Sequence, residues 1–355
     1  MSNLNTTAGR PPAPAKIKLP RVNGRYLWPL LGLFLLLAVN LAITPEFFRI
    51  EIQDGRLYGS LIDVLNRSAP VALLAIGMTL VIATGGIDLS VGATMAIAGA
   101  VCANLIVGGV DSIFLVVAAG LAAGLMAGAV NGGLVSYMGI QPIVATLILM
   151  VAGRGIAQLI NAGQIVTFQS EAFAFIGTGT LLGLPFPIVL VLIVFALVQL
   201  LMRKTALGLF VESVGCNAGA SYYLGINQRA VKIVAYCIAG ICAALAGMIS
   251  AADIQGSDAN NAGLWLELDA ILAVVIGGAS LMGGRFSIPL SIVGVLVIQC
   301  LGTTIIMSGL PAKFNLLIKA VVVIFVLLLQ SPLFQQQMGA LFARFQKRTN
   351  TEAKV

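Results

Sequence analysis

Apolar runs follow one another along almost the whole chain, and each is close to the ~20 residues that a helix needs to cross a bilayer. Backbone N–H and C=O groups in lipid must be hydrogen-bonded within their own segment, so such runs are predicted to be helices. Of the 355 residues, 59% are hydrophobic and 9% are charged, whereas soluble domains carry about 25% charged residues. The chain is therefore predicted to be an all-α, polytopic membrane protein without a separate soluble domain.

Basic residues predict which loops face the cytoplasm, because cytoplasmic loops carry an excess of Lys and Arg. Residues 1–25 contain five basic and no acidic residues, which predicts a disordered cytoplasmic tail. The pair Arg203 and Lys204, Arg285 and the basic C-terminal residues mark the same side. About ten spans within residues 26–331, the second beginning near residue 69, place both termini in the cytoplasm, with 332–355 as a second tail.

One apolar run is interrupted, in the stretch GMTLVIATGGIDLSVGATMAIAG between Gly77 and Gly99. Gly85 and Gly86 permit a break because glycine tolerates backbone angles closed to other residues. Asp88 and Ser90 follow where a second helix would begin, so each is a candidate cap for its free N–H groups. Two interpretations stay open: a charge that lines a protein-covered cavity, or a tight cytoplasmic turn with Asp88 as a solvated cap.

A second stretch, DAILAVVIGGASLMGG, repeats this pattern near the other end of the chain. It runs in the same direction into the glycine pair Gly277 and Gly278, followed shortly by Ser280. The likeness predicts re-entrant or broken helices in both places and, as a hypothesis, a parallel internal repeat. The two glycine pairs are candidate hinges.

Arg154 lies inside another apolar run, VAGRGIAQLI. An arginine at the centre of a membrane helix costs about 2.5 to 3.5 kcal/mol on translocon scales, so it is normally paired or solvated. It is either a functional residue or a structural one that snorkels or pairs with a carboxylate such as Asp88. The candidates for a substrate pathway are Asp88, Ser90, Arg154 and Gln164.

A stripe of glycines at 120, 124, 128 and 132 favours close packing between helices rather than a substrate path.

Several kinds of chemistry are excluded by the residues that are missing. The chain has no histidine, no CxxC pair among its five cysteines, no metal-ligand cluster and no Gly-Lys dipeptide for a phosphate-binding P-loop. A non-catalytic protein that binds no metal or cofactor is predicted. The net charge of +7 marks topology, so lipid rather than nucleic acid is the expected surrounding. A pathway for a neutral polar solute fits best.

The most hydrophilic stretch on the basic side is residues 205–227, which predicts one or two short amphipathic helices. Such helices bury their apolar face against lipid headgroups, against the bundle or against a partner protein.

Three segments resemble the permease subunits of ribose-type bacterial ABC sugar importers: GMTLVIATGGIDLSVGA, DAILAVVIGGASLMGGR and TALGLFVESVGCNAGASYYLGIN. The resemblance covers about residues 60 to 330. Within that family, IQPIVATLILMVAGRGIAQLI, AGQIVTF and DIQGSDANNAGLWLELDAILAVVIGG are most similar to inner-membrane permeases of galactofuranose importers.

The resemblance implies a transmembrane permease domain over 26–331 that carries a monosaccharide, a pentose or a galactofuranose-type sugar, across the bacterial inner membrane. It implies three partners: a cytoplasmic ABC ATPase that uses ATP, a periplasmic sugar-binding protein, and a second permease, either a copy of this chain or a paralogue. Residues 205–227 would be the segment that couples to the ATPase. The alternative is a secondary transporter or facilitator that works without an ATPase. The family's coupling motif falls here on Glu212, Gly215, Asn217, Ala218, Ala220 and Gly225.

Two departures from the family bear on the details of docking: no basic residue lies near Gly219, and the pair Tyr222 and Tyr223 is unusual.

Overall fold

The computed structural model describes residues 24–43, 45–53, 56–307, 317–321 and 324. Almost all of the predicted tails, and most of the last predicted span, lie outside these residues. The described elements are α1 (Gly24–Ile43), η1 (Pro45–Phe48), β1 (Glu51–Gln53), β2 (Arg56–Tyr58), α2 (Ser60–Ala83), α3 (Val91–Val107), α4 (Ile113–Ser136), α5 (Pro142–Ile160), β3 (Val166–Thr167), α6 (Glu171–Thr178), β4 (Thr180–Leu181), β5 (Leu184–Pro185), α7 (Phe186–Lys204), α8 (Ala206–Cys216), α9 (Ala218–Tyr223), α10 (Gln228–Asp253), β6 (Gly256–Ser257), α11 (Leu266–Ile276) and α12 (Ile288–Met307).

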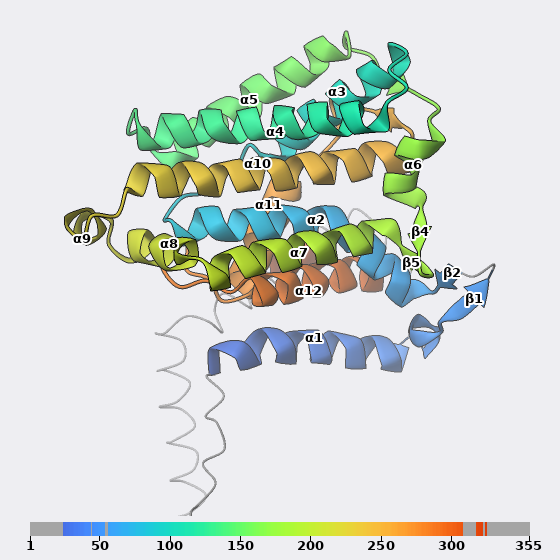
Figure 1. Cartoon of the computed structure of the whole chain (residues 1–355). Helices are drawn as coiled ribbons and strands as arrows, with labels where there is room; N and C mark the ends of the chain where they lie inside the picture. The colour runs from blue at the N-terminus through green and yellow to red at the C-terminus, as the bar shows by residue number, and fades with distance from the viewer. Residues whose placement is uncertain (1–23, 44, 54–55, 308–316, 322–323, 325–355) are drawn as a thin grey trace, which may run out of the picture.

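The long helices lie roughly side by side in layers (Figure 1). Within the described part of the chain, six are long and apolar enough to cross a membrane: α2, α4, α5, α7, α10 and α12. The chain is therefore a mostly helical membrane protein, as predicted. The count of ten spans and the internal repeat stay predictions.

One predicted boundary is wrong: α2 begins at Ser60, not near residue 69. Residues 60–68 continue the helix because Ile62, Val64 and Ser68 face the bundle and are buried, while Asp63 and Arg67 point away and are exposed. Asp63 and Arg67 were placed in a connection, but they lie on the same outer face of two successive turns of α2.

The centre of the bundle is formed by α2 and α10, which pack against each other, with α4 and α3 on α10 and with α12, α11 and α7 on α2. The predicted glycine stripe of α4 is a packing surface. A Cβ added to Gly124 would lie 2.4 Å from the carbonyl oxygen of Gly240 on α10, and one added to Gly128 would lie 2.3 Å from that of Tyr236. Small residues let these two helices touch backbone to backbone.

The two ends of the bundle differ in structure. At one end lie α8, α9 and the interruptions between α2 and α3 and between α11 and α12; we call it the α8 end (Figure 1, left). At the other lie α6 and the antiparallel hairpins β1–β2 and β4–β5; we call it the α6 end. A third antiparallel pair joins β3 to β6, with Val166 opposite Ser257, and so ties the segment before α6 to the connection between α10 and α11.

Candidate functional site

The segment 205–227 folds as the two short helices α8 and α9, as predicted. Each beginning is set by a polar residue: the side chain of Thr205 accepts a hydrogen bond from the N–H of Leu207, and that of Asn217 accepts one from Ala220. Asn227 caps α10 in the same way. Such caps satisfy N–H groups that a helix start leaves free, which is why the segment divides here.

Helix α8 packs directly on both interrupted regions of the bundle. A Cβ added to Gly215 would lie 1.8 Å from the carbonyl oxygen of Ala83, the last residue of α2, and 2.5 Å from the nitrogen of Gly284. The N–H of Gly284 itself donates to the carbonyl oxygen of Ala83 at 2.9 Å. A Cβ added to Gly283 would lie 2.9 Å from the carbonyl oxygen of Gly215 and 2.9 Å from the nitrogen of Gly85. The predicted hinge and coupling segments therefore meet backbone to backbone.

The helices before both interruptions, α2 and α11, end in the same way. Gly85 has φ +81° and Gly278 has φ +83°, and the following residue donates an N–H to the carbonyl five residues back, Gly86 to Val81 at 3.0 Å and Ala279 to Val274 at 3.2 Å. A left-handed glycine followed by this bond is the Schellman end of a helix.

This geometry corrects the residue matching used for the proposed repeat. Because Gly85 is equivalent to Gly278, Gly86 corresponds to Ala279 and Gly277 to Thr84, and Ser90 corresponds to Gly283 rather than to Ser280. The two breaks therefore share a helix end but not the polar residues that follow it.

Asp88 is buried in protein, with 2% of its surface exposed, so the interpretation as a solvated cap is wrong. Its Oδ1 accepts hydrogen bonds from the backbone N–H of Ser90 at 2.9 Å and from the Oγ of Ser90 at 2.6 Å. Asn131 on α4 donates to the Oγ of Ser90 at 2.7 Å and lies 3.4 Å from Asp88 Oδ1. Asp88 thus anchors the turn before α3 to α4, and the Ser90 side chain makes no cap bond to α3.

Two polar atoms beside this network are buried and, among the described residues, have no hydrogen-bond partner: the Tyr236 hydroxyl and the Asn131 Oδ1. The tyrosine comes from α10, and a Cβ added to Gly86 would lie 2.7 Å from its oxygen. Helices α4 and α10 therefore both direct polar groups at the first interruption. Neither Asn131 nor Tyr236 stood out in the sequence, because each is a single polar residue in an apolar run.

Arg154 does not bond to Asp88; it holds a loop. Its guanidinium donates to the carbonyl oxygens of Ala259, at 3.1 Å, and of Ala262, both in the connection 254–265 between α10 and α11. Gln158 Nε2 donates to Asn260 Oδ1 at 2.6 Å, and Asn161 Nδ2 donates to both oxygens of Ser257 at 3.0 Å. Main-chain carbonyls, which no side-chain pattern marks, are thus the partners of the intramembrane arginine.

The three donors form a stripe on α5 and its end that was missed in the sequence, although their spacing of four and three residues is the spacing of one helix face. Gln164 lies beyond this stripe, in an exposed turn where its N–H donates to the Asn161 carbonyl at 3.0 Å. The role of the four candidate residues in a substrate pathway stays a prediction.

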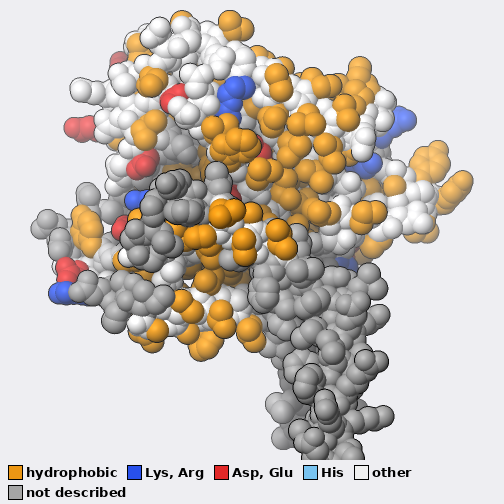
Figure 2. All heavy atoms as spheres, turned by 180° about the vertical axis from the view of Figure 1, so that it is seen from behind, with side chains coloured by type: hydrophobic (Ala, Val, Ile, Leu, Met, Phe, Trp, Pro, Cys, Tyr) orange, Lys and Arg blue, Asp and Glu red, His pale blue; other side chains and the backbone are white. Residues whose placement is uncertain are grey.

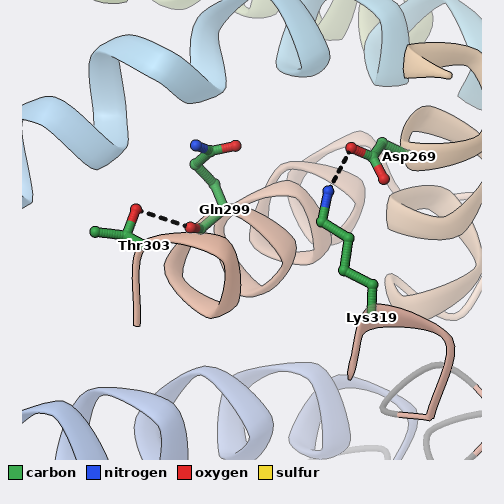
Figure 3. A network of polar contacts seen from close by, with 4 residues as sticks. All are labelled: Asp269, Gln299, Thr303 and Lys319. Carbon is green, nitrogen blue, oxygen red and sulfur yellow. Dashed lines mark hydrogen bonds and ion pairs between the residues drawn. The ribbon is translucent and has the colours of Figure 1, made fainter. Parts of the chain in front are cut away.

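A second polar contact inside the bundle holds α11. Lys319 Nζ lies 2.8 Å from Asp269 Oδ2, and both side chains are mostly buried. Figure 3 shows the pair beside Gln299 of α12, whose carbonyl oxygen accepts a hydrogen bond from the Thr303 hydroxyl at 3.1 Å. This ion pair joins α11 to the segment 317–321.

The described residues contain no group of three His, Cys, Asp or Glu side chains that could hold a metal ion.

Apolar spanning helices, two interruptions and a surface helix packed on both define a polytopic membrane protein of the transporter class. The chain belongs to the family described as "Branched-chain amino acid transport system / permease component", which matches residues 60–327. This match, together with the sugar permeases to which the chain is similar, confirms the resemblance noted in the sequence.

Its relatives are permeases of sugar importers. The chain is 58% identical to the galactofuranose transporter permease protein YtfT of Escherichia coli, over 87% of this chain and 92% of that one. It is 40% identical to the fructose import permease protein FruF of Bifidobacterium longum, over 86% and 87% of the two chains. It is 36% identical to the ribose import permease protein RbsC of E. coli, over 85% and 92%. No solved structure matches the chain.

Proposed function

We propose that this chain is the membrane subunit of an ABC importer that brings a monosaccharide into the bacterial cytoplasm, with a galactofuranose-type sugar as the first candidate and a pentose as the second. The observation that carries the choice of sugar is the 58% identity to a galactofuranose transporter permease over nearly the full length of both chains. The chain itself binds no cofactor, and ATP is hydrolysed by a partner subunit.

The α8 end faces the cytoplasm in this proposal. Arg203 and Lys204 end α7 there, Arg229 and Lys232 begin α10, and Arg285 lies in the second interruption. The α6 end carries acidic residues, among them Glu171, Asp253 and Asp258. The basic residues at the α8 end agree with the positive-inside rule, although Arg49, Arg56 and Arg67 lie toward the α6 end. The cytoplasmic location of both termini is part of the same proposal.

The ATPase docks on α8 and α9. A groove of about 500 Å³ lies between the end of α7, α8 and the start of α12, with Arg203 and Glu212 among its lining residues. Next to it, α9 and the residue after it expose the side chains of Tyr222, Tyr223 and Leu224, which are 70%, 89% and 78% exposed. Exposed aromatic residues beside a charged groove are typical of a protein interface.

The residues that match the family's coupling motif have different tasks in this geometry. Glu212 faces the groove, and Gly215 lies against the two interruptions. Asn217, Ala218, Ala220 and Gly225 shape the α9 turn: Asn217 caps it, the Ala218 carbonyl accepts from Gln228, and Gly225 leaves it with φ +80°.

The face opposite to the view of Figure 1 is the candidate surface for the second permease and for lipid. Helix α5 exposes apolar side chains along its length, including Ile148, Val151 and Leu159 at 54%, 69% and 81%. Figure 2 shows a broad band of hydrophobic side chains across this face, with most acidic side chains at the left and basic side chains at both sides and in the upper centre. The sugar-binding protein would dock at the acidic α6 end.

The test is uptake of radiolabelled sugar into proteoliposomes that hold this chain and its ATPase, with ATP and the binding protein present or withheld. Uptake that needs all of the components supports the proposal. Uptake by the chain alone would show a facilitator instead. Transport would then depend on a substrate-coupled site inside the bundle and not on α8.

A further inference from the structure

A cavity of about 330 Å³ opens at the α6 end, between α3, α10 and the connection 254–265. Its volume lies at the lower limit of the ~300 to 1,000 Å³ that small-molecule sites occupy. The inner wall is formed by small and apolar residues, among them Met95, Gly99 and Gly247. None of the pathway candidates from the sequence lines it.

Polar residues also line the cavity: Ser250 and Asp253 come from α10, and Asp258 and Asn261 come from the connection 254–265, which forms the polar outer wall. These groups offer carboxylate, hydroxyl and amide partners, which are the groups that bind the hydroxyls of an uncharged sugar. The lining includes no basic residue, so an anionic solute would lack a partner there.

Asp258 is fixed in place yet keeps acceptor capacity. Its Oδ1 accepts the backbone N–H groups of Asn260 at 2.9 Å and Asn261 at 3.2 Å, and its Oδ2 accepts the Asn261 side-chain amide at 2.7 Å. A carboxylate has about four lone-pair positions, so three bonds leave room for a ligand hydroxyl. The same amide bond lowers the pKa of Asp258, which therefore stays ionised as an acceptor.

The polar wall is held from outside the cavity by α5 and β3. Arg154 donates to the carbonyls of Ala259 and Ala262, Asn161 donates to Ser257, and β3 pairs with β6. Helix α5 has only 22% of its span buried within this chain. A movement of α5 against α10 would pull on the polar wall through these bonds, while Gly263 of the same connection stays packed on Gly92 of α3.

We propose that this cavity is the first binding site on the permease for the uncharged sugar delivered at the α6 end, and that Arg154 positions its polar wall. The inference rests on the proposed function, because it takes a sugar as the ligand and the α6 end as the side of delivery. The site lies within one chain, so it needs no residue from a second permease.

The test uses two substitutions that change the cavity from opposite walls. Gly99→Val fills the inner wall: a Cβ at Gly99 has its nearest contact at 3.5 Å, with the Cβ of Ala251, so the first carbon fits and the two methyl groups take cavity space. Asp258→Asn keeps the shape of the outer wall and removes the charge. Gly133→Val on α4 is the matched control, because a Cβ there meets nothing within 4 Å.

Binding of D-galactose and D-ribose to the purified chain is measured by saturation-transfer NMR, and the KM of sugar uptake is measured in the full transporter. We expect Gly99→Val to abolish the NMR signal and Asp258→Asn to raise KM about ten-fold, as for the loss of a hydrogen bond to a charged group. The rate of ATP hydrolysis stimulated by the binding protein should remain, because the α8 end is untouched.

The proposal would be overturned if Gly99→Val and Asp258→Asn both kept the NMR signal and the KM of the unchanged chain. The proposal would also be overturned if the control Gly133→Val abolished the NMR signal as fully as Gly99→Val, since the loss would then not come from the cavity. If the wild-type transporter imports no sugar, the proposed function fails instead, and the NMR comparison of Gly99→Val with the unchanged chain still decides whether the cavity binds a sugar.

Arg154→Gln tests the positioning role. We expect a higher KM, faster hydrogen exchange in residues 254–265 and an unchanged maximal rate. A purely structural role in α5 would lower the amount of folded protein or the maximal rate while the KM stayed the same.

Discussion

The two ends of the bundle are held together by different kinds of contact. At the α8 end, α8 and both interruptions touch through the backbones of Gly215, Gly284 and Ala83. At the α6 end, the connection 254–265 borders a cavity, and the side chains of Arg154 and Asn161 hold it in addition to the backbone pairing of β3 with β6. Backbone contacts without intervening side chains transmit a displacement directly, because close-packed groups have no room to absorb it. Long side chains can re-form their bonds at a new distance, which suits a wall that must open.

The largest effect is expected from Gly215→Ala. The new Cβ would fall 1.8 Å from the Ala83 oxygen, so α8 must move off the interruptions. Overpacking of this kind costs about 1 to 3 kcal/mol, and we expect ATP-driven uptake to fall at least ten-fold. The control is Gly219→Ala, whose Cβ would lie 3.4 Å from its nearest neighbour, the Asn217 Oδ1. Equal uptake in the two variants would remove the contrast between the ends.

The next effect is expected from Asp88→Ala, which leaves the N–H and hydroxyl of Ser90 without their acceptor in a buried site. An unsatisfied buried donor costs about 1 to 3 kcal/mol, so the midpoint of thermal unfolding in detergent should fall. Asp88→Asn keeps an acceptor oxygen and should lose less. If both variants melt like the unchanged protein, the network is not what holds the first interruption.

A smaller and local effect is expected from Arg154→Lys, which changes the group on α5 that binds the carbonyls of Ala259 and Ala262. Lysine has one compact ammonium in place of the forked guanidinium, so it reaches the two carbonyls less well. Hydrogen exchange should quicken in residues 254–265 and stay unchanged in 84–90 and 277–287. For Gly215→Ala we expect the reverse pattern, and exchange that rises at both ends in either variant would show that the ends are not independent.

The smallest effect is expected from pH. The pKa of Asp258 is below its ordinary value of 3.8, first because Asn261 donates to it. A depressed pKa means that the folded protein favours the ionised form, so its stabilising effect is complete above the ordinary value and is lost as the pH falls through the folded value. Sugar binding and exchange in 254–265 should therefore be constant from about pH 5 to 8, and a change within that range would point to a different group.

Much of the local structure could be read from the chain in order. The caps Thr205, Asn217 and Asn227 divide the surface helices where polar residues precede apolar ones. The left-handed helix ends require glycine, and Gly85 and Gly278 supply it. The start of α2 was missed because Asp63 and Arg67 were taken as part of a loop, although residues four apart lie on one face of a helix.

The partners of the polar side chains could not be read in the same way. Helix α3 is apolar on every side, so hydrophobic periodicity marks no face on it. On α4 the glycine stripe marks the packing face, but it does not show which helix packs there or at what depth. Whether Asn131 reaches Ser90, or Arg154 reaches Ala259 on a distant connection, depends on that rotation.

The sequence by itself determined that this chain is a helical membrane protein with two glycine interruptions and a surface segment between them, because hydrophobic length, glycine and charge bias act locally. Its place among sugar permeases came from the resemblance of its motifs to that family. Only the tertiary structure decided that α8 closes on both interruptions and that Arg154 holds a cavity wall. These contacts join groups far apart in the chain, and they form only when packing has set the depth and rotation of each helix.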